Sequence, residues 1–147
     1  MHFNFLMLTS AIFTAISFVE RAKAGTIQLR DGEIATKETI LEWISTTDAN
    51  LTFIGDPITK RNIESTMVVY CSVRTVDVCG GACTVYNGGA TCLNAPDTNC
   101  LSATNNVGFC DHSGCGGSCN QLSTCGVRLD DGFCYTPGTN SINVGAF

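Results

Sequence analysis

Histidine is almost absent from this chain, which has two among its 147 residues, His2 and His112. His2 falls in a leader that we expect to be removed, so a Ser-His-Asp or Cys-His nucleophile pair would have to use His112. That residue follows Asp111 in a glycine-rich loop, and we interpret it as an exposed loop residue and not as a general base. The scarcity of histidine therefore argues against nucleophilic catalysis.

The acidic pair Asp130-Asp131 is the remaining candidate for acid-base chemistry. Two carboxylates could in principle support glycoside hydrolysis. However, adjacent residues in a turn point apart, and Asp-Gly is turn chemistry in its own right. We expect no catalytic residue, no metal site and no cofactor, and an enzyme is the function class that the sequence favours least.

Basic residues and long apolar runs are also scarce. The chain has 8 Lys and Arg against 13 Asp and Glu, a net charge of −5. A surface of this sign does not attract nucleic acid or anionic lipid. After the leader, no stretch approaches the roughly 20 apolar residues of a membrane span. We therefore expect a secreted, extracellular product whose partner is an extracellular protein or a cell-wall polysaccharide.

The first 24 residues have the features of a secretory signal peptide. An apolar run over residues 5–19 is followed by Ala22-Lys23-Ala24, a small-x-small site that predicts cleavage between Ala24 and Gly25. The residues before the run carry no Lys or Arg, which departs from the usual pattern. An uncleaved anchor or a buried helix is the alternative interpretation.

Cysteine is missing from residues 25–70 and abundant after them. The ten cysteines are Cys71, Cys79, Cys83, Cys92, Cys100, Cys110, Cys115, Cys119, Cys125 and Cys134. An even number of cysteines behind a signal peptide predicts five disulfides. Zinc is the competing interpretation, because two pairs have C-x₃-C spacing. We therefore divide the chain into a signal peptide (1–24), an N-terminal segment (25–61) and a cysteine-rich domain (62–147).

Two similar motifs, Cys79-Gly80-Gly81-Ala82-Cys83 and Cys115-Gly116-Gly117-Ser118-Cys119, divide the cysteines into two blocks of five. Because five is odd, full oxidation requires at least one bridge between the blocks, although the connectivity cannot be read from the sequence. We interpret the glycines as residues that let crowded disulfides pack. The alternative is a nest of backbone amides that holds an anion.

The segments between the cysteines are typical of strands and tight turns. Residues 66–73 predict a strand, and Asn87-Gly88 predicts a type I′ turn that would place Cys83 opposite Cys92. We expect two more hairpins, one around Asn105-Asn106 and one that turns at Asp131-Gly132. The predicted fold is small, disulfide-rich and mainly β, built from short hairpins with one short N-terminal helix.

That helix is expected over residues 36–45, with Thr36 as its cap, Glu38 in its first turn, and Ile40, Leu41 and Ile44 on one face. The chain then breaks at Gly55-Asp56-Pro57. If residues 25–61 belong to the working protein, this helix is part of it.

Two processing sites are also candidates in the N-terminal segment. Asn50-Leu51-Thr52 is a glycosylation sequon on an expected exposed loop, which is either modified at Asn50 or left as an unmodified loop. Lys60-Arg61 is either a kexin-type cleavage site, which would make residues 25–61 a propeptide, or a solvated pair of charges.

Five aromatic residues of the cysteine-rich region are candidates for stacking on sugar rings if they share one face. In so small a domain we expect most of them to lie in the core. They are Tyr70, Tyr86, Phe109, Phe133 and Tyr135.

The region from Val69 to Thr139 resembles small secreted cysteine-rich proteins of mushroom-forming (basidiomycete) fungi. The similarity is carried by residues 79–93, 108–111 and 115–120, which include both C-G-G-x-C motifs. Residues 25–65 show no such similarity. The resemblance implies extracellular release and roles in signalling, host interaction or substrate interaction, without an assigned biochemical activity and without catalytic residues to carry over.

We therefore expect a non-enzymatic small secreted protein that acts in extracellular interactions, either effector-like or associated with the cell wall, through loops displayed on a disulfide scaffold. A secreted inhibitor, or an antimicrobial or toxin-like protein, is the alternative. The acidic charge argues against membrane disruption, which generally uses a basic amphipathic surface.

Overall fold

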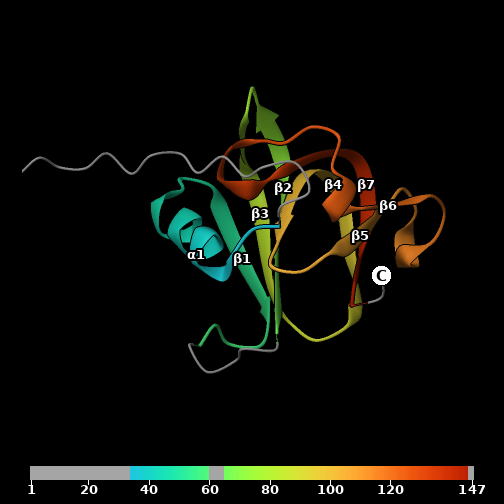
Figure 1. Cartoon of the computed structure of the whole chain (residues 1–147), viewed down its shortest axis with the longest axis horizontal. Helices are drawn as coiled ribbons and strands as arrows, with labels where there is room; N and C mark the ends of the chain where they lie inside the picture. The colour runs from blue at the N-terminus through green and yellow to red at the C-terminus, as the bar shows by residue number, and fades with distance from the viewer. Residues whose placement is uncertain (1–33, 60–64, 146–147) are drawn as a thin grey trace, which may run out of the picture.

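The computed structural model describes residues 34–59 and 65–145, which form one α-helix, three short 3₁₀ helices and one seven-stranded sheet (Figure 1). The signal cleavage site at Ala24 and Gly25 and the Lys60-Arg61 pair lie outside the described residues. The elements are α1 (Lys37–Thr46), β1 (Asn50–Gly55), β2 (Thr66–Thr75), β3 (Val78–Gly88), β4 (Thr91–Ala103), β5 (Val107–Cys110), β6 (Cys119–Gln121) and β7 (Cys134–Val144). The prediction of a small, disulfide-rich, mainly β fold with one helix is confirmed.

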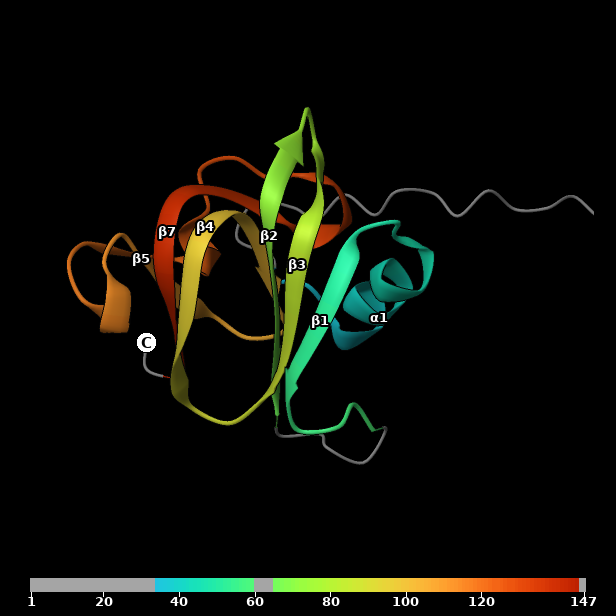
Figure 2. The ribbon, with the colours of Figure 1, turned by 180° about the vertical axis from the view of Figure 1, so that it is seen from behind.

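The strands follow the order β1-β3-β2-β4-β7-β5-β6 in the sheet. β1 runs parallel to β3, and the other neighbours are antiparallel. Because β1 precedes the first cysteine and pairs with β3, the described part of the N-terminal segment and the cysteine-rich region share one sheet. Figure 2 shows the β2–β3 hairpin projecting above the rest of the sheet.

Helix α1 forms where the sequence predicts it. The hydroxyl of Thr36 accepts a hydrogen bond from the Thr39 amide at 3.2 Å and caps the helix, as expected. Ile40 and Trp43 are the buried apolar residues, and the Trp43 ring packs on that of Phe133 with the ring centroids 4.9 Å apart. Leu41 was expected on the same face, but it is 37% exposed because Trp43 occupies the inner side of the helix.

Two hydrophobic clusters pack on opposite faces of β2, since successive strand residues point to opposite sides. Val69 belongs to the cluster under the helix, here the α1 cluster, and Val68 to the cluster on the other face, the β7 cluster. The α1 cluster is Ala35, Ile40, Trp43, Met67, Val69, Cys71, Cys79, Cys83, Val85, Cys100, Leu129 and Phe133. The β7 cluster is Val68, Tyr70, Tyr86, Leu93, Ala95, Leu101, Ala103, Val107, Leu122, Cys134, Ile142 and Val144.

The hairpin predicted at Asn87-Gly88 is wrong. β3 and β4 are consecutive in the chain, but β2 lies between them in the sheet, and both Asn87 and Gly88 belong to β3. The Asn87 side chain is buried and bonds to the carbonyls of Asp56 and Pro57 and to the Ser65 hydroxyl. These long-range contacts hold Asn87 in a strand and override its preference for turns.

Of the other two predicted hairpins, one is wrong and one is confirmed. The chain at Asn105-Asn106 does not join paired strands, because β5 lies between β7 and β6. At Asp131-Gly132 the chain does reverse: both residues have positive φ, 57° and 79°, and Arg128 pairs with Cys134 in an antiparallel bridge. Left-handed backbone at both central positions is what a tight primed turn requires.

The five predicted disulfides are confirmed, and all ten cysteines take part in them. The zinc alternative is therefore excluded for these residues. The bridge considered between Cys83 and Cys92 is wrong, because Cys83 is bridged to Cys71 and Cys92 is bridged to Cys115. The pairs are Cys71–Cys83, Cys79–Cys100, Cys92–Cys115, Cys110–Cys119 and Cys125–Cys134. Cys92–Cys115 is the one bridge that joins the two blocks, which satisfies the odd-number argument.

The two C-G-G-x-C motifs share a local geometry. In each, the last cysteine is bridged to a directly opposite residue on the neighbouring antiparallel strand, with a Cα–Cα distance of 4.1 Å. In each, the second glycine has positive φ, +82° at Gly81 and +75° at Gly117. Gly81 occupies a bulge in β3, a position that glycine takes readily.

We predict that Gly81→Ala destabilises the fold by roughly 1–3 kcal/mol. A Cβ at this position would lie 2.6 Å from Cγ2 of Val73, and the backbone has positive φ. Gly80→Ala is the matched control, because its Cβ would meet nothing within 4 Å. Denaturant unfolding measures the free energy of unfolding of both variants. Equal values would contradict the conclusion that the bulge at position 81 requires glycine.

Candidate functional site

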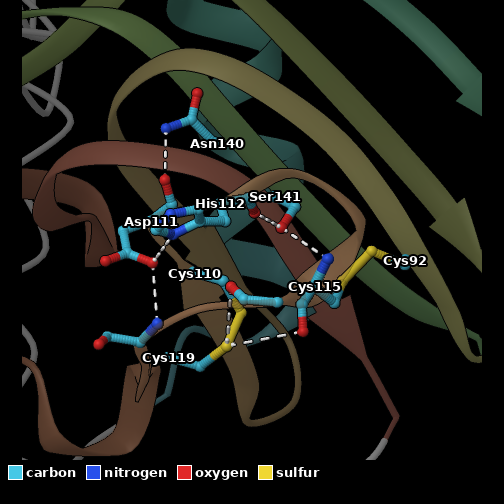
Figure 3. Close-up of a disulfide and its surroundings, with 10 residues drawn as sticks. Cys92, Cys110, Asp111, His112, Cys115, Cys119, Asn140 and Ser141 are labelled. Carbon is cyan, nitrogen blue, oxygen red and sulfur yellow. Dashed lines mark hydrogen bonds and ion pairs between the residues drawn. A yellow bond between two sulfur atoms is a disulfide. The ribbon is translucent and has the colours of Figure 1, made fainter.

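The residue that the sequence singles out for catalysis, His112, lies in an exposed loop as expected, with its side chain 72% exposed. Its Nδ1 lies 2.6 Å from Oδ1 of Asp111, the preceding residue (Figure 3). The same Oδ1 accepts a hydrogen bond from the Ser118 amide at 2.8 Å. The sequence placed Asp111 beside His112 but carried no signal that the carboxylate folds back onto the imidazole.

Ser141 approaches this Asp-His pair from β7, but it is not directed at the imidazole. Its hydroxyl donates to the backbone carbonyl of His112 and accepts from the Cys115 amide at 2.9 Å (Figure 3). Activation of a serine requires a base in hydrogen-bond contact with its hydroxyl. The arrangement therefore fixes the loop to β7 and does not assemble a nucleophile.

Two backbone amides of the second C-G-G-x-C motif donate to acceptors of the protein itself. The Ser118 amide binds the Asp111 carboxylate, and the Cys115 amide binds Ser141. A Cβ on Gly117 would lie against Asp111 Oδ1 and the His112 ring, so glycine is required for this packing. These contacts favour the packing role of the glycines over an open anion nest.

The hydrogen bonds from His112 and Ser118 hold the pKa of the Asp111 carboxyl below its ordinary value. Both partners favour the charged carboxylate, which is why the shift is downward. Because the folded-state value is depressed, the charge stabilises the fold above the ordinary pKa of an aspartate. This contribution is lost as the pH falls through the lowered value.

The other candidate carboxylates, Asp130 and Asp131, belong to the turn after Leu129, in which Asp131 has a left-handed φ of 57°. The Asp130 amide donates to the Asp77 carbonyl at 2.8 Å, which ties this turn to the β2–β3 hairpin. In residues 34–59 and 65–145, no group of three or more His, Cys, Asp or Glu side chains is arranged to hold a metal ion.

The five aromatic side chains do not form a shared stacking face. Phe133 and Tyr135 are associated with the α1 cluster, whereas Tyr70, Tyr86 and Phe109 are associated with the β7 cluster on the opposite side. The expectation that most of them lie in the core is confirmed.

The sequon asparagine, Asn50, is exposed, but it begins strand β1 and does not lie on a loop. Asn50 lies in a strand for a long-range reason. β1 forms by parallel pairing with β3, from Asn50 opposite Ala82 to Gly55 opposite Asn87. Local sequence does not reveal such pairing. The side-chain amide of Asn50 can still receive a glycan at the start of the strand.

The exposed tip of the β2–β3 hairpin is a site that the sequence did not indicate. The turn residues are Val76 and Asp77, and Val76 is 77% exposed with a left-handed φ of 56°. Val73 and Val78 are also exposed on the flanking strands. Left-handed backbone is a genuine outlier for a β-branched residue, and residues held in this way cluster at functional sites. We define the hairpin tip as Val73–Val78.

Several contacts hold the hairpin tip rigidly. The Arg74 guanidinium lies 4.2 Å from the Tyr135 ring centroid, and its Nε donates to the Val76 carbonyl at 2.6 Å. Arg74 also lies 3.9 Å from the Asp77 carboxylate. The Cys79–Cys100 bridge joins the start of β3 to β4. The strained valine is therefore presented on a braced support.

No protein-family model matches the chain, and the searches of curated proteins and of solved structures likewise found no match. Within the described part of the chain, no helix is both long enough and apolar enough to cross a membrane.

We predict that Asp111→Ala lowers the melting temperature at pH 6 and that the difference from wild type shrinks as the pH falls below about 4. Alanine is used because asparagine would create a sequon with Ser113. Thermal unfolding across the pH range tests this, with Asp48→Ala as the control at an exposed carboxylate. A difference that stays constant with pH would show that the charge of Asp111 is not responsible.

We predict that the chain carries an N-linked glycan at Asn50 when it is expressed through a eukaryotic secretory pathway. Intact-mass measurement should give a glycan mass that is lost in both Asn50→Gln and Thr52→Ala and kept in Thr52→Ser, because the sequon accepts either hydroxyl residue. A mass that equals the polypeptide alone would reject the prediction.

Proposed function

We propose that this chain is a non-enzymatic secreted protein that binds an extracellular protein partner through the hairpin tip. The observation that carries the proposal is the exposed, left-handed Val76 on a braced hairpin. An effector-like role, as the resemblance to small secreted fungal proteins implies, is part of this proposal. Five disulfides and the expected signal peptide support secretion.

Rigidity is what makes the hairpin tip suitable for binding. A contact residue that is already fixed in its bound conformation loses little entropy on association. Apolar side chains that enter a pocket of the partner commonly provide much of the binding energy at an interface. Val76, with Val73 and Val78 beside it, offers such an apolar projection.

The tip favours a protein over a polysaccharide as its partner. Sugar recognition generally uses exposed aromatic faces, but Tyr135 at this end of the molecule is half-buried and covered by Arg74. Three aliphatic side chains instead match an apolar pocket in a protein surface. A secreted inhibitor would present the same hairpin tip to an enzyme. The inhibitor alternative is therefore the case in which the protein partner is an enzyme.

The test compares wild type with Val76→Asn for retention on intact cells, protease-treated cells, chitin and insoluble glucan. Asparagine accepts the left-handed backbone and removes the apolar contact, so the fold should be at least as stable as wild type. We expect wild type to be retained on intact cells and Val76→Asn to lose roughly tenfold or more in affinity.

Val127→Asn is the matched control, because Val127 is an exposed valine outside the hairpin tip. Retention of Val127→Asn at the wild-type level would confirm that the loss of binding is specific to substitution at the hairpin tip. Failure of wild type to bind any of the four surfaces, or equal retention of Val76→Asn, would overturn the proposal. Binding that survives protease treatment would point to a polysaccharide partner instead and would likewise reject it.

A further inference from the structure

Strand β1 leaves one edge of the sheet open. It is the first strand in the sheet order, and within residues 34–59 and 65–145 its one hydrogen-bonded neighbour is β3. α1 lies beside β1 in Figure 2, yet five of the six residues of β1 are exposed. The helix therefore leaves most of β1 exposed, and no other described strand pairs with the outer side of its backbone.

β1 has none of the usual features that protect an edge strand. Natural edges are generally blunted by lysine, proline or bulges. The residues of β1, Asn-Leu-Thr-Phe-Ile-Gly, include no charge and no proline, and the register with β3 is continuous. Phe53 is 55% exposed and Ile54 is 40% exposed. An exposed, regular and apolar edge is a template for another strand.

The side chains of β1 offer apolar contacts on both faces of the sheet. Phe53 is opposite Val85 and lies on the side of the α1 cluster, while Ile54 is opposite Tyr86 on the side of the β7 cluster. Phe53, Ile54 and Ile58 also line a surface groove with Val85. A strand added along this edge could bury alternate side chains against each of the two faces.

The charges around the edge indicate which kind of strand would fit. Exposed carboxylates flank β1 at both ends, Asp48 before it and Asp56 after it. Lys37 lies near the second end, where its ammonium donates to the Thr59 carbonyl at 3.1 Å. A second copy in antiparallel register would bring Asp48 near Asp56 of the other copy, which costs free energy through repulsion.

We propose that the open edge of β1 accepts an extended segment of a partner protein that is apolar at its centre and basic at its ends. Main-chain hydrogen bonds would provide affinity, and Phe53 and Ile54 would select β-branched side chains. The basic ends would be attracted to Asp48 and Asp56 and to the net charge of −5. This surface is separate from the hairpin tip and does not depend on it.

The probe is the peptide acetyl-Lys-Thr-Val-Thr-Val-Thr-Lys-amide, titrated into the full chain carrying Asn50→Gln so that a glycan at the first residue cannot block the edge. We expect a Kd below about 1 mM and slower amide hydrogen exchange in β1. In a control peptide, the third and fourth residues, valine and threonine, are replaced by two prolines, which removes two backbone donors. That peptide should bind at least about tenfold more weakly.

Two protein variants of unchanged charge locate the binding surface. Phe53→Thr/Ile54→Thr keeps strand propensity and removes the apolar contacts, and it should weaken binding of the probe by about fivefold or more. Val78→Thr is the matched control, because Val78 is also 55% exposed but lies at the hairpin tip. Val78→Thr should bind the probe like wild type. The experiment therefore tests the edge of β1 independently of the function proposed for the hairpin tip.

Five results would overturn this proposal, and the first four concern the peptide probes. They are equal binding of the proline-containing peptide, equal binding of a peptide with glutamate at both ends, protection of amides away from β1, and no binding at 5 mM probe, about five times the expected limit. A fifth is self-association of the protein that is lost in Phe53→Thr/Ile54→Thr by sedimentation analysis. That result would assign the edge to a second copy of the chain.

Discussion

The fold depends on two buried disulfides that join three adjacent strands of the sheet, β3, β2 and β4. Cys71–Cys83 links β2 to β3, and Cys79–Cys100 links β3 to β4. All four cysteines are buried in the α1 cluster. Each disulfide contributes about 2–4 kcal/mol. Cross-linking these three strands therefore stabilises the surface against which α1 packs.

Both proposed interaction surfaces are built on β3, the strand that carries two of these cysteines. The hairpin tip ends where β3 begins, at Val78, and the open edge belongs to β1, which pairs with β3 from Ala82 to Asn87. Cys79 and Cys83 lie between the tip and most of the β1 pairing. The bridges thus restrict movement of both surfaces relative to the core, which reduces the entropy that either would lose on binding.

Local signals in the sequence predicted the elements that local physics controls. The cap at Thr36, the strand after Thr66 and the turn at Asp131-Gly132 all depend on residues close together in the chain, and all three are confirmed. β1 and the position of Asn87 depend on partners about 30 residues away. The left-handed Val76 is imposed by its surroundings against its own preference, so the sequence did not indicate the hairpin tip.

The repeated C-G-G-x-C motif shows where local prediction ends. In both copies the last cysteine bridges a directly opposite strand neighbour and the second glycine has positive φ, because these features are set within one hairpin. The first cysteines, Cys79 and Cys115, both bridge to β4, but to different positions on it. Those partners are decided by the order of strands in the sheet, which spacing does not encode. The similar motifs therefore specify two similar local bridges, while the bridge between the blocks depends on the assembled sheet.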